Sequence, residues 1–383
     1  MIASVQAAAV RDTTALGRPT TPADDVEFVH MNPMAGTGST RGRVERFAPP
    51  WPEVICVVTL ADGTWGVGMT AHAGPVRPII ADYLAPLLVD QTVEGVDDIA
   101  ELWDLMARVG SAHVGTGGVL SHAISAVDLA LHDALGRREG MPVYDLLGGP
   151  AHDAIECYGT GADIDTLVDL GFTRFKIPCP WPASGPVGVE SAVAAVTAAR
   201  SVVGDADLML DGWAVMDACE AVSVCRAVEA HDLRFVEDIV HPDDVDGYSH
   251  LRTATTVGLA AGERWYGVDV FDHHAAHGNV DVLQPDPLWV GGATAVVRIA
   301  AVARRHDVEL AIHCGANDGF GQHLCFALAE NTLGEMYVGS AQSLVGAYRA
   351  TPGMALPDAG RLVPADTPGF GLDLTLEAIE AAT

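Results

Sequence analysis

Ionisable residues recur at regular intervals in the second half of the chain, each at the end of a short apolar run. Asp211, Glu237 and Glu263 follow one another at intervals of 26 residues. Further residues of this kind follow at intervals of 23, 27 and 22 residues: Asp286, His313 and Glu335. If each run is a buried strand of one repeated β/α unit, every unit returns the chain to the same rim. The spacing therefore predicts a single polar pocket built from these side chains.

The first three of these residues predict a metal site. Asp211, Glu237 and Glu263 are all carboxylates, with no His or Cys among them. Such a set of hard oxygen ligands favours Mg²⁺ and leaves room for substrate oxygens. Zinc hydrolase barrels need histidine pairs at strand ends, and no His-X-His sequence ends a strand here.

The next residues predict proton transfer. A carboxylate beside an imidazole fixes its tautomer and raises its basicity, so Asp286 and His313 together indicate a general base. Glu335, one strand further, could brace the same histidine. Lys176, the only lysine of the chain, ends another strand-like run and could pair with a substrate carboxylate or stabilise an enolate oxygen.

The elements that would carry these residues alternate between strand and helix from about residue 154 onward. Apolar, β-branched runs predict eight strands over 154–159, 172–177, 207–211, 233–237, 257–263, 280–286, 308–313 and 335–339. Alanine-rich segments such as 190–203 and 293–306 have the three- and four-residue apolar spacing of helices. Eight such repeats predict an α/β fold, a TIM-like barrel of seven or eight β/α units.

The first part of the chain lacks this repeat. Residues 52–70 read as two strands joined by an Asp-Gly turn, and 75–89 and 96–109 read as amphipathic helices. A long helix over 123–140 would join the two parts. We therefore expect an N-terminal α+β capping domain (1–125), a catalytic barrel (126–340) and a C-terminal segment (341–383) that packs back on the cap.

Composition limits the partners. The chain has 383 residues and a formal net charge of −30, which repels nucleic acid phosphates and acidic membrane surfaces. No apolar run reaches 18 residues and the N-terminus lacks a basic region, so we expect a cytoplasmic protein that neither spans a membrane nor is secreted. The seven cysteines form no Cys-X-X-Cys pair and are expected to be reduced.

Ordered motifs along nearly the whole chain resemble the mandelate racemase subgroup of the enolase superfamily, and within it the L-rhamnonate dehydratase-like acid-sugar dehydratases. The motifs are HMNPM (30–34), AISAVDLALHDALG (123–136), PVYDLLGG (142–149), YGTGA (158–162), GFTRFKIP (171–178), LMLDGW (208–213), FVED (235–238), AGE (261–263), VLQPDPLWVGG (282–292) and PGFG (368–371).

This resemblance implies the same roles for the strand-end residues. Asp211, Glu237 and Glu263 would be Mg²⁺ ligands, and the other members of the implied catalytic set are Asp286, His313, Lys176 and Glu335. Racemases of this group carry a second lysine two residues after the first, as the base on the opposite substrate face. This chain has Pro178 there.

The resemblance also implies substrate contacts from the capping domain. His30 matches a substrate histidine of the family, and a nearby arginine, Arg46 in preference to Arg43, would also contact substrate. In the barrel part, Trp289 could line the pocket or could pack in the core. Arg264 follows the third metal ligand where rhamnonate dehydratases carry a histidine, which leaves the identity of the sugar acid open.

The expected reaction is the Mg²⁺-dependent dehydration of an aldonic acid to a 2-keto-3-deoxy acid through an enediolate. With one histidine base and no second lysine, β-elimination is served better than transfer of a proton between two faces. The alternatives are a racemase or epimerase of a 2-hydroxy acid, and a non-catalytic descendant that binds a metal or sugar acid. Relatives assemble as dimers to octamers, so we expect a homo-oligomer.

Overall fold

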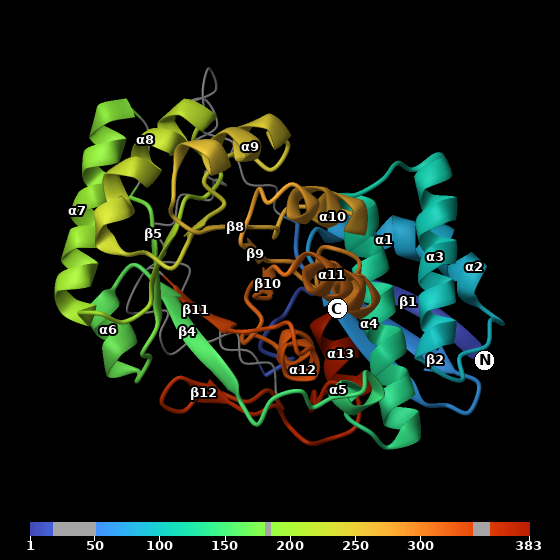
Figure 1. Ribbon diagram of the computed structural model, residues 1–383. Helices are drawn as coiled ribbons and strands as arrows, with labels where there is room; N and C mark the ends of the chain where they lie inside the picture. Colours follow the sequence, from blue (N-terminus) through green and yellow to red (C-terminus); the bar gives the residue numbers. More distant parts are fainter. Residues whose placement is uncertain (18–50, 181–184, 340–352) are drawn as a thin grey trace.

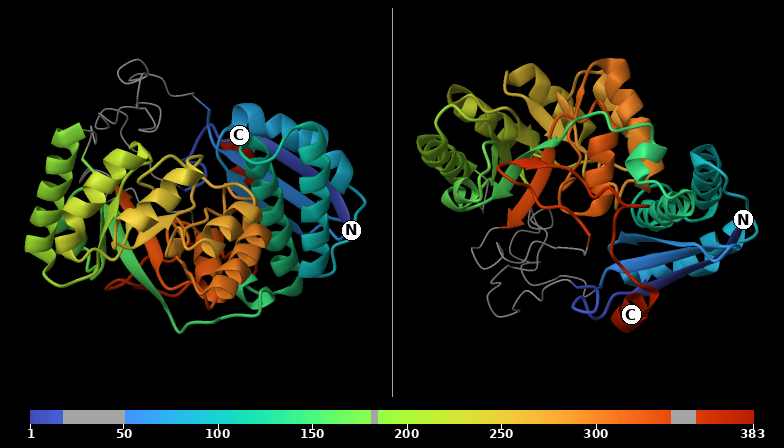
Figure 2. Two further views of the ribbon diagram at one scale, coloured as in Figure 1. Left: turned by 45° about the horizontal axis from the view of Figure 1, so that its top comes forward. Right: turned by 90° about the horizontal axis from the view of Figure 1, so that it is seen from below.

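A computed structural model describes residues 1–17, 51–180, 185–339 and 353–383. The chain forms a small antiparallel sheet covered by helices, beside a curled parallel sheet with helices around its outside (Figure 1). Figure 2 shows the antiparallel sheet and its helices standing against one flank of the barrel.

The antiparallel sheet has the order β1-β2-β3, with β1 at Ile2–Ala9, β2 at Val54–Leu60 and β3 at Trp65–Thr70. The hairpin predicted over 52–70 is confirmed, and Gly63 in its turn has a φ of 88°. Strand β1 was not predicted.

The helices of this part are α1 (Ala73–Pro78), the π-helix η3 (Ile79–Leu84), α2 (Ala85–Leu88), α3 (Val96–His113) and α4 (Val119–Glu139). Helix α4 is buried continuously from Leu120 to Gly136, between the antiparallel sheet and the barrel. Gly66 and Gly68 of β3 allow this contact, because a Cβ atom at either position would lie about 2 Å from the α4 backbone.

All eight predicted barrel strands are present. They are β4 (Ile155–Gly161), β5 (Phe175–Pro178), β6 (Leu208–Asp211), β7 (Val236–Glu237), β8 (Leu259–Ala261), β9 (Val282–Leu283), β10 (Glu309–Leu310) and β11 (Gly334–Gly339). They are parallel in the order β10-β9-β8-β7-β6-β5-β4-β11, and a bridge between Leu310 and Asn331 brings the two ends together. The α/β barrel with an N-terminal α+β cap is thus confirmed.

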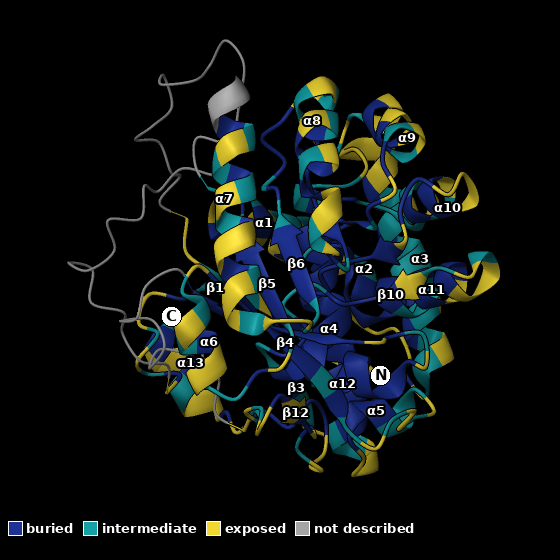
Figure 3. Cartoon of the chain, turned by 60° about the vertical axis from the view of Figure 1, so that its left-hand side comes forward, coloured by how far each residue is buried: buried dark blue, intermediate teal, exposed yellow. Residues whose placement is uncertain are grey.

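Helices surround the strands. They are α5 (Val143–Leu146), α6 (Ile164–Asp169), α7 (Gly185–Val203), α8 (Ala218–Val228), the 3₁₀ helix η4 (Glu229–His231), α9 (Val245–Ala254), α10 (Val268–Ala276), α11 (Gly292–His306) and α12 (Gly319–Ala327). Figure 3 shows exposed residues on the outer faces of α7 to α11 and buried residues toward the strands. This division explains the apolar periodicity of these segments.

Side chains fill the barrel interior, so it is a packed core and not a channel. The inward-facing cluster consists of Tyr158, Met209, Phe235, Ala260, Val282, Ala311 and Leu333. The polar residues at the strand ends lie beyond this layer, toward the carboxyl ends of the strands.

The last part of the chain contains β12 (Arg361–Leu362), which pairs with β4, and α13 (Leu376–Ala382). The backbone N–H of Arg11 donates to the carbonyl of Ala382 at 2.7 Å, and the N–H of Phe370 donates to Asp133 of α4 at 2.9 Å. These bonds join the C-terminal residues to the capping part, although the domain boundaries given above stay predictions.

All seven cysteines are free thiols. No helix among the described residues is long and apolar enough to cross a membrane.

Candidate active site

Five of the predicted strand-end residues lie at the carboxyl-terminal rim of the barrel. Lys176 and Glu335 were also predicted to end strands, but each is the second residue of its strand, β5 and β11. Asp211 and Glu237 end β6 and β7 and are direct partners in the parallel register. Glu263, Asp286 and His313 follow β8, β9 and β10 by two or three residues. Because neighbouring parallel strands end at one edge, side chains separated by tens of residues meet there.

Asp286 and His313 form the expected pair. The Nδ1 atom of His313 lies 2.8 Å from Oδ2 of Asp286, whose Oδ1 accepts from the backbone N–H of Leu288 at 2.7 Å. Burial alone would lower the pKa of His313, but Cys314 and the hydrogen bond to Asp286 outweigh burial and raise this pKa well above its usual value. The histidine is thereby oriented and made more basic.

Glu263 contacts this base directly. Its Oε2 lies 2.8 Å from Nε2 of His313, and its Oε1 is in close contact with the guanidinium of Arg264. The same guanidinium lies 3.6 Å from Oδ2 of Asp238 and 5.8 Å from the centre of the Trp289 ring. Arg264 therefore brings positive charge to the rim, where the resemblance had only marked a departure from the family.

Lys176 is held inside the rim, with its side chain 1% exposed. Its ammonium donates to both carboxylate oxygens of Glu237, at 2.7 and 2.6 Å, and lies 2.7 Å from Oε1 of Glu335. Burial acts to raise the pKa of Glu335, but Lys176 and His313 outweigh burial and lower it to about 2. Lys176 thus carries two ion pairs within the protein.

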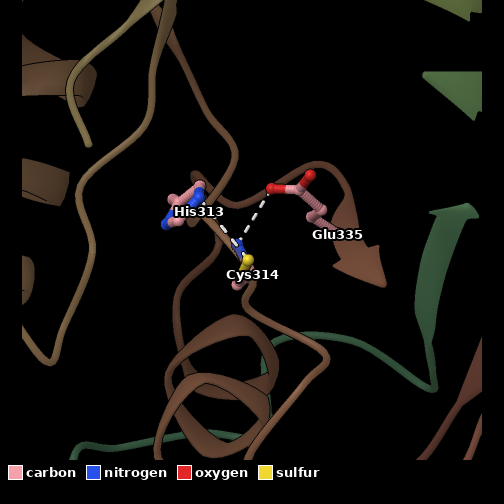
Figure 4. A group of neighbouring side chains, drawn as sticks. All are labelled: His313, Cys314 and Glu335. Carbon is pink, nitrogen blue, oxygen red and sulfur yellow. Dashed lines mark hydrogen bonds between the residues drawn. The ribbon is translucent and has the colours of Figure 1, made fainter. Parts of the chain in front are cut away.

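Glu335 reaches the histidine through its neighbour. Its Oε2 accepts from the backbone N–H of Cys314 at 2.9 Å, and its Oε1 accepts from the Thr160 hydroxyl at 2.6 Å. Figure 4 shows Glu335 turned toward Cys314, with the His313 ring on the other side. The expected bracing of His313 therefore takes the form of a bond to the next residue along the backbone.

Several partners of the rim were not predicted. Gln284 donates to Oε2 of Glu237 at 2.6 Å and is fully buried. The thiol of Cys314 lies 3.5 Å from Nε2 of His313. Gln284 stands two residues before Asp286 on the same strand end, so its position in the sequence could have indicated its place on the rim.

The donor chemistry at the rim fits a hard divalent cation. Three carboxylates, Asp211, Glu237 and Glu263, stand on three consecutive strand ends, and two of them are at present paired with cationic side chains. Among the described residues, the ligand atoms that lie within 4.8 Å of one another belong to His313, Cys314 and Glu335. Asp211, Glu237 and Glu263 do not form such a group among the described residues, and Lys176 pairs with both Glu237 and Glu335. The chemistry of the three carboxylates is nevertheless that of the oxygen ligands that Mg²⁺ prefers, and their role as its ligands stays a prediction.

Trp289 forms a wall of the site, with its ring centre 5.2 Å from that of His313. Leu288, the residue before it, accepts a hydrogen bond from Thr70 of β3 at 2.5 Å. The wall is therefore fixed by the capping part of the chain. His30, Arg46 and Arg43 lie outside the described residues.

The chain matches two family models. Residues 160–379 match the enolase C-terminal domain-like family, and residues 51–148 match the N-terminal domain of mandelate racemase / muconate lactonizing enzyme. The first match covers more than half of the chain and includes every described residue of the predicted site.

Two related proteins have names that refer to L-rhamnonate dehydratase. The chain is 33% identical over 333 residues to an L-rhamnonate dehydratase of Saccharopolyspora erythraea, a match that covers 85% of this chain and 83% of the relative. It is 32% identical over 335 residues to a protein of Caldivirga maquilingensis named as a possible L-rhamnonate dehydratase, covering 85% and 82% of the two chains.

A solved structure of L-rhamnonate dehydratase from Gibberella zeae superposes with a TM-score of 0.81 at 25% identity and covers 98% of this chain and 94% of that one. A 3,6-anhydro-D-galactonate cycloisomerase from Zobellia galactanivorans gives 0.74 at 30% identity, covering 86% and 94%. With a capped barrel, a rim of carboxylates and a paired histidine, the chain belongs to the enolase superfamily, as an enzyme of the mandelate racemase / muconate lactonizing enzyme group.

Proposed function

We propose that the protein is a Mg²⁺-dependent hydro-lyase that converts an aldonic acid into a 2-keto-3-deoxy acid, as an L-rhamnonate dehydratase-like enzyme. The observation that carries the proposal is the presence of one oriented base. His313 is bonded to Asp286, whereas Lys176 is held by two carboxylates and is poorly placed to act as a second base. One base suits elimination better than racemisation.

Asp211, Glu237 and Glu263 would hold the cation, whose charge would neutralise the negative charge that develops on the substrate carboxylate. His313 Nε2 would remove the proton from C2, giving an enediolate. The resulting imidazolium would then return that proton to the 3-hydroxyl, so that water leaves from C3. The remaining enol becomes the 2-keto-3-deoxy acid by gaining a proton at C3 and losing one from the 2-hydroxyl.

Charge limits how the substrate enters. The net charge of −30 opposes an anionic acid at long range. Arg264 supplies a local positive charge at the rim, and we propose that Trp289 beside it lines the substrate pocket. His30 and Arg46 remain proposed substrate contacts.

The test is to incubate the protein with five- and six-carbon aldonates and Mg²⁺, and to assay for 2-keto-3-deoxy acids. We expect product from at least one acid, and His313→Asn should abolish it because the variant lacks the base, while Mg²⁺ binding measured by calorimetry is retained. His277→Asn, at the exposed end of α10, should keep full activity.

Absence of product from every acid would contradict the proposal. Exchange of the C2 proton for deuterium without loss of water would indicate a racemase or epimerase instead.

A further inference from the structure

A second histidine stands at the candidate site, on the side of the capping part. His122 of α4 is 4% exposed, and its ring centre lies 6.1 Å from that of Trp289 and 6.1 Å from that of Tyr266. Trp289 in turn lies 5.2 Å from His313. The Trp289 ring therefore lies close to both the proposed base, His313, and His122.

The hydrogen bonds around His122 determine its tautomer. The Thr70 hydroxyl has one proton, which it donates to the carbonyl of Leu288 at 2.5 Å. The same hydroxyl lies 2.8 Å from Nδ1 of His122, so it must accept there and Nδ1 must carry the proton. The Nε2 atom then keeps its lone pair, and no described residue donates a hydrogen bond to it.

The surroundings keep this histidine neutral. Burial and the neighbouring His72 lower the pKa of His122 to about 3. The Nε2 atom of His122 is not among the fully buried atoms that lack a partner, so a hydrogen-bond donor from outside the protein can reach it. A sugar hydroxyl is a suitable donor, and the aromatic rings of Trp289 and Tyr266 suit the C–H faces of a sugar chain.

We propose that Nε2 of His122 accepts a hydrogen bond from a hydroxyl at the far end of the sugar acid, beyond C4, and that His122 is thereby a specificity-determining residue. This inference rests on the proposed function. It assigns a preference for acids of five or six carbons, because a four-carbon acid has no hydroxyl beyond C4.

The test compares a four-carbon aldonate with five- and six-carbon aldonates in the presence of Mg²⁺. In His122→Phe, which keeps the ring volume but removes the acceptor, we expect KM and the calorimetric Kd of the longer acids to rise about tenfold or more. Values for the four-carbon acid, and kcat for all acids, should change little. His277→Phe serves as the control histidine.

Two further variants test the proposed hydrogen bond to Nε2 of His122. Thr70→Val removes the hydroxyl that fixes the tautomer and should weaken binding of the same longer acids by a smaller factor. His122→Gln restores an acceptor and should recover part of the lost affinity. It also tests the inference if His122→Phe does not fold.

An equal rise of Kd for short and long acids, or a loss confined to kcat, would overturn the inference. If the unaltered protein binds the acids but dehydrates none of them, the proposed function is wrong. The binding measurements would still show whether His122 recognises the distal hydroxyl.

Discussion

At the scale of single residues, the only lysine of the chain has a structural task within the site. Lys176 is buried between Glu237 and Glu335, and each of these carboxylates has a further bond, to Gln284 and to Thr160. The ammonium therefore balances two negative charges beside the base and fixes where both carboxylates point.

Removing this charge should destabilise the fold. Lys176→Met leaves two buried carboxylates without their cation, and such a loss costs about 3–5 kcal/mol of unfolding free energy. Urea unfolding in the absence of divalent cations measures the loss.

The matched control is Arg361→Met. Arg361 pairs with Glu156 at 2.9 Å but its side chain is 60% exposed, so the change should cost less than about 1 kcal/mol. Equal losses for the two variants would show that the ion pairs of Lys176 contribute little.

The sequence identified the rim residues because their spacing reflects the barrel repeat, but it could not identify their partners. Which partner a buried charged side chain takes depends on the side chains around it in the folded protein, and these come from distant parts of the chain. Glu335 therefore bonds to Lys176 and Cys314 and does not reach His313 directly. His122 was missed because one histidine in an alanine-rich helix has no periodic signal.

At the scale of elements, the loop that joins β9 to α11 depends on contacts with α3 and α4. Trp103 donates to the carbonyl of Gly291 at 2.7 Å, and the N–H of Gly291 donates to Ser125 at 2.8 Å. Asp128 accepts from the N–H and the hydroxyl of Thr294, at 3.0 and 2.6 Å. These bonds hold the start of α11 against the capping part.

Gly292 is required for this close packing. It has a φ of 83°, and a Cβ atom there would lie 2.4 Å from Oδ2 of Asp128. Gly292→Ala should therefore combine backbone strain of about 1–2 kcal/mol with an overpacking cost of about 1–3 kcal/mol. Thermal or urea unfolding gives the total.

Gly278→Ala separates the two effects. Gly278 also has a positive φ, 62°, but no atom lies within 4 Å of the added carbon. It should show the backbone strain alone, and a loss as large as that of Gly292→Ala would contradict the packing argument.

Barrel strands and helices were predictable because their apolar patterns repeat. Strand β1 was not, since its sequence IASVQAAA is rich in alanine, which favours helices. It is extended because it pairs with β2 along nearly its whole length. Tertiary pairing thus overrides a weak local preference that sequence alone would follow.

At the scale of the whole molecule, a buried histidine lies where the C-terminal segment meets the barrel. The ring of His323 in α12 lies 5.1 Å from that of Tyr144 and 5.6 Å from that of Phe370. Neither of its ring nitrogens has a hydrogen-bond partner among the described residues. Burial lowers the pKa of His323 to about 3.

This histidine should make the fold less stable in acid. An unfolded chain binds the proton with a pKa of about 6.5, so between pH 6.5 and 3 the unfolded state carries more protons than the folded state. The protonation of this one group therefore leaves the free energy of unfolding unchanged above pH about 6.5 and lowers it by about 2 kcal/mol by pH 5. Urea unfolding at pH 7.5 and 5 should show this part of the loss disappear in His323→Phe.

His277→Phe, at an exposed histidine, is the matched control substitution. An identical acid loss with and without His323 would show that other groups, such as His122 and His274 with similarly lowered pKa values, account for it.

The hydrogen bond from Thr70 to Leu288 has a mechanical consequence. Trp289 follows Leu288 directly and its ring contacts His313, so a displacement of the capping part would pull on the tryptophan beside the base. Thr70 is more than 200 residues from His313 along the chain, yet a change at Thr70 would alter the position of an aromatic ring beside that histidine.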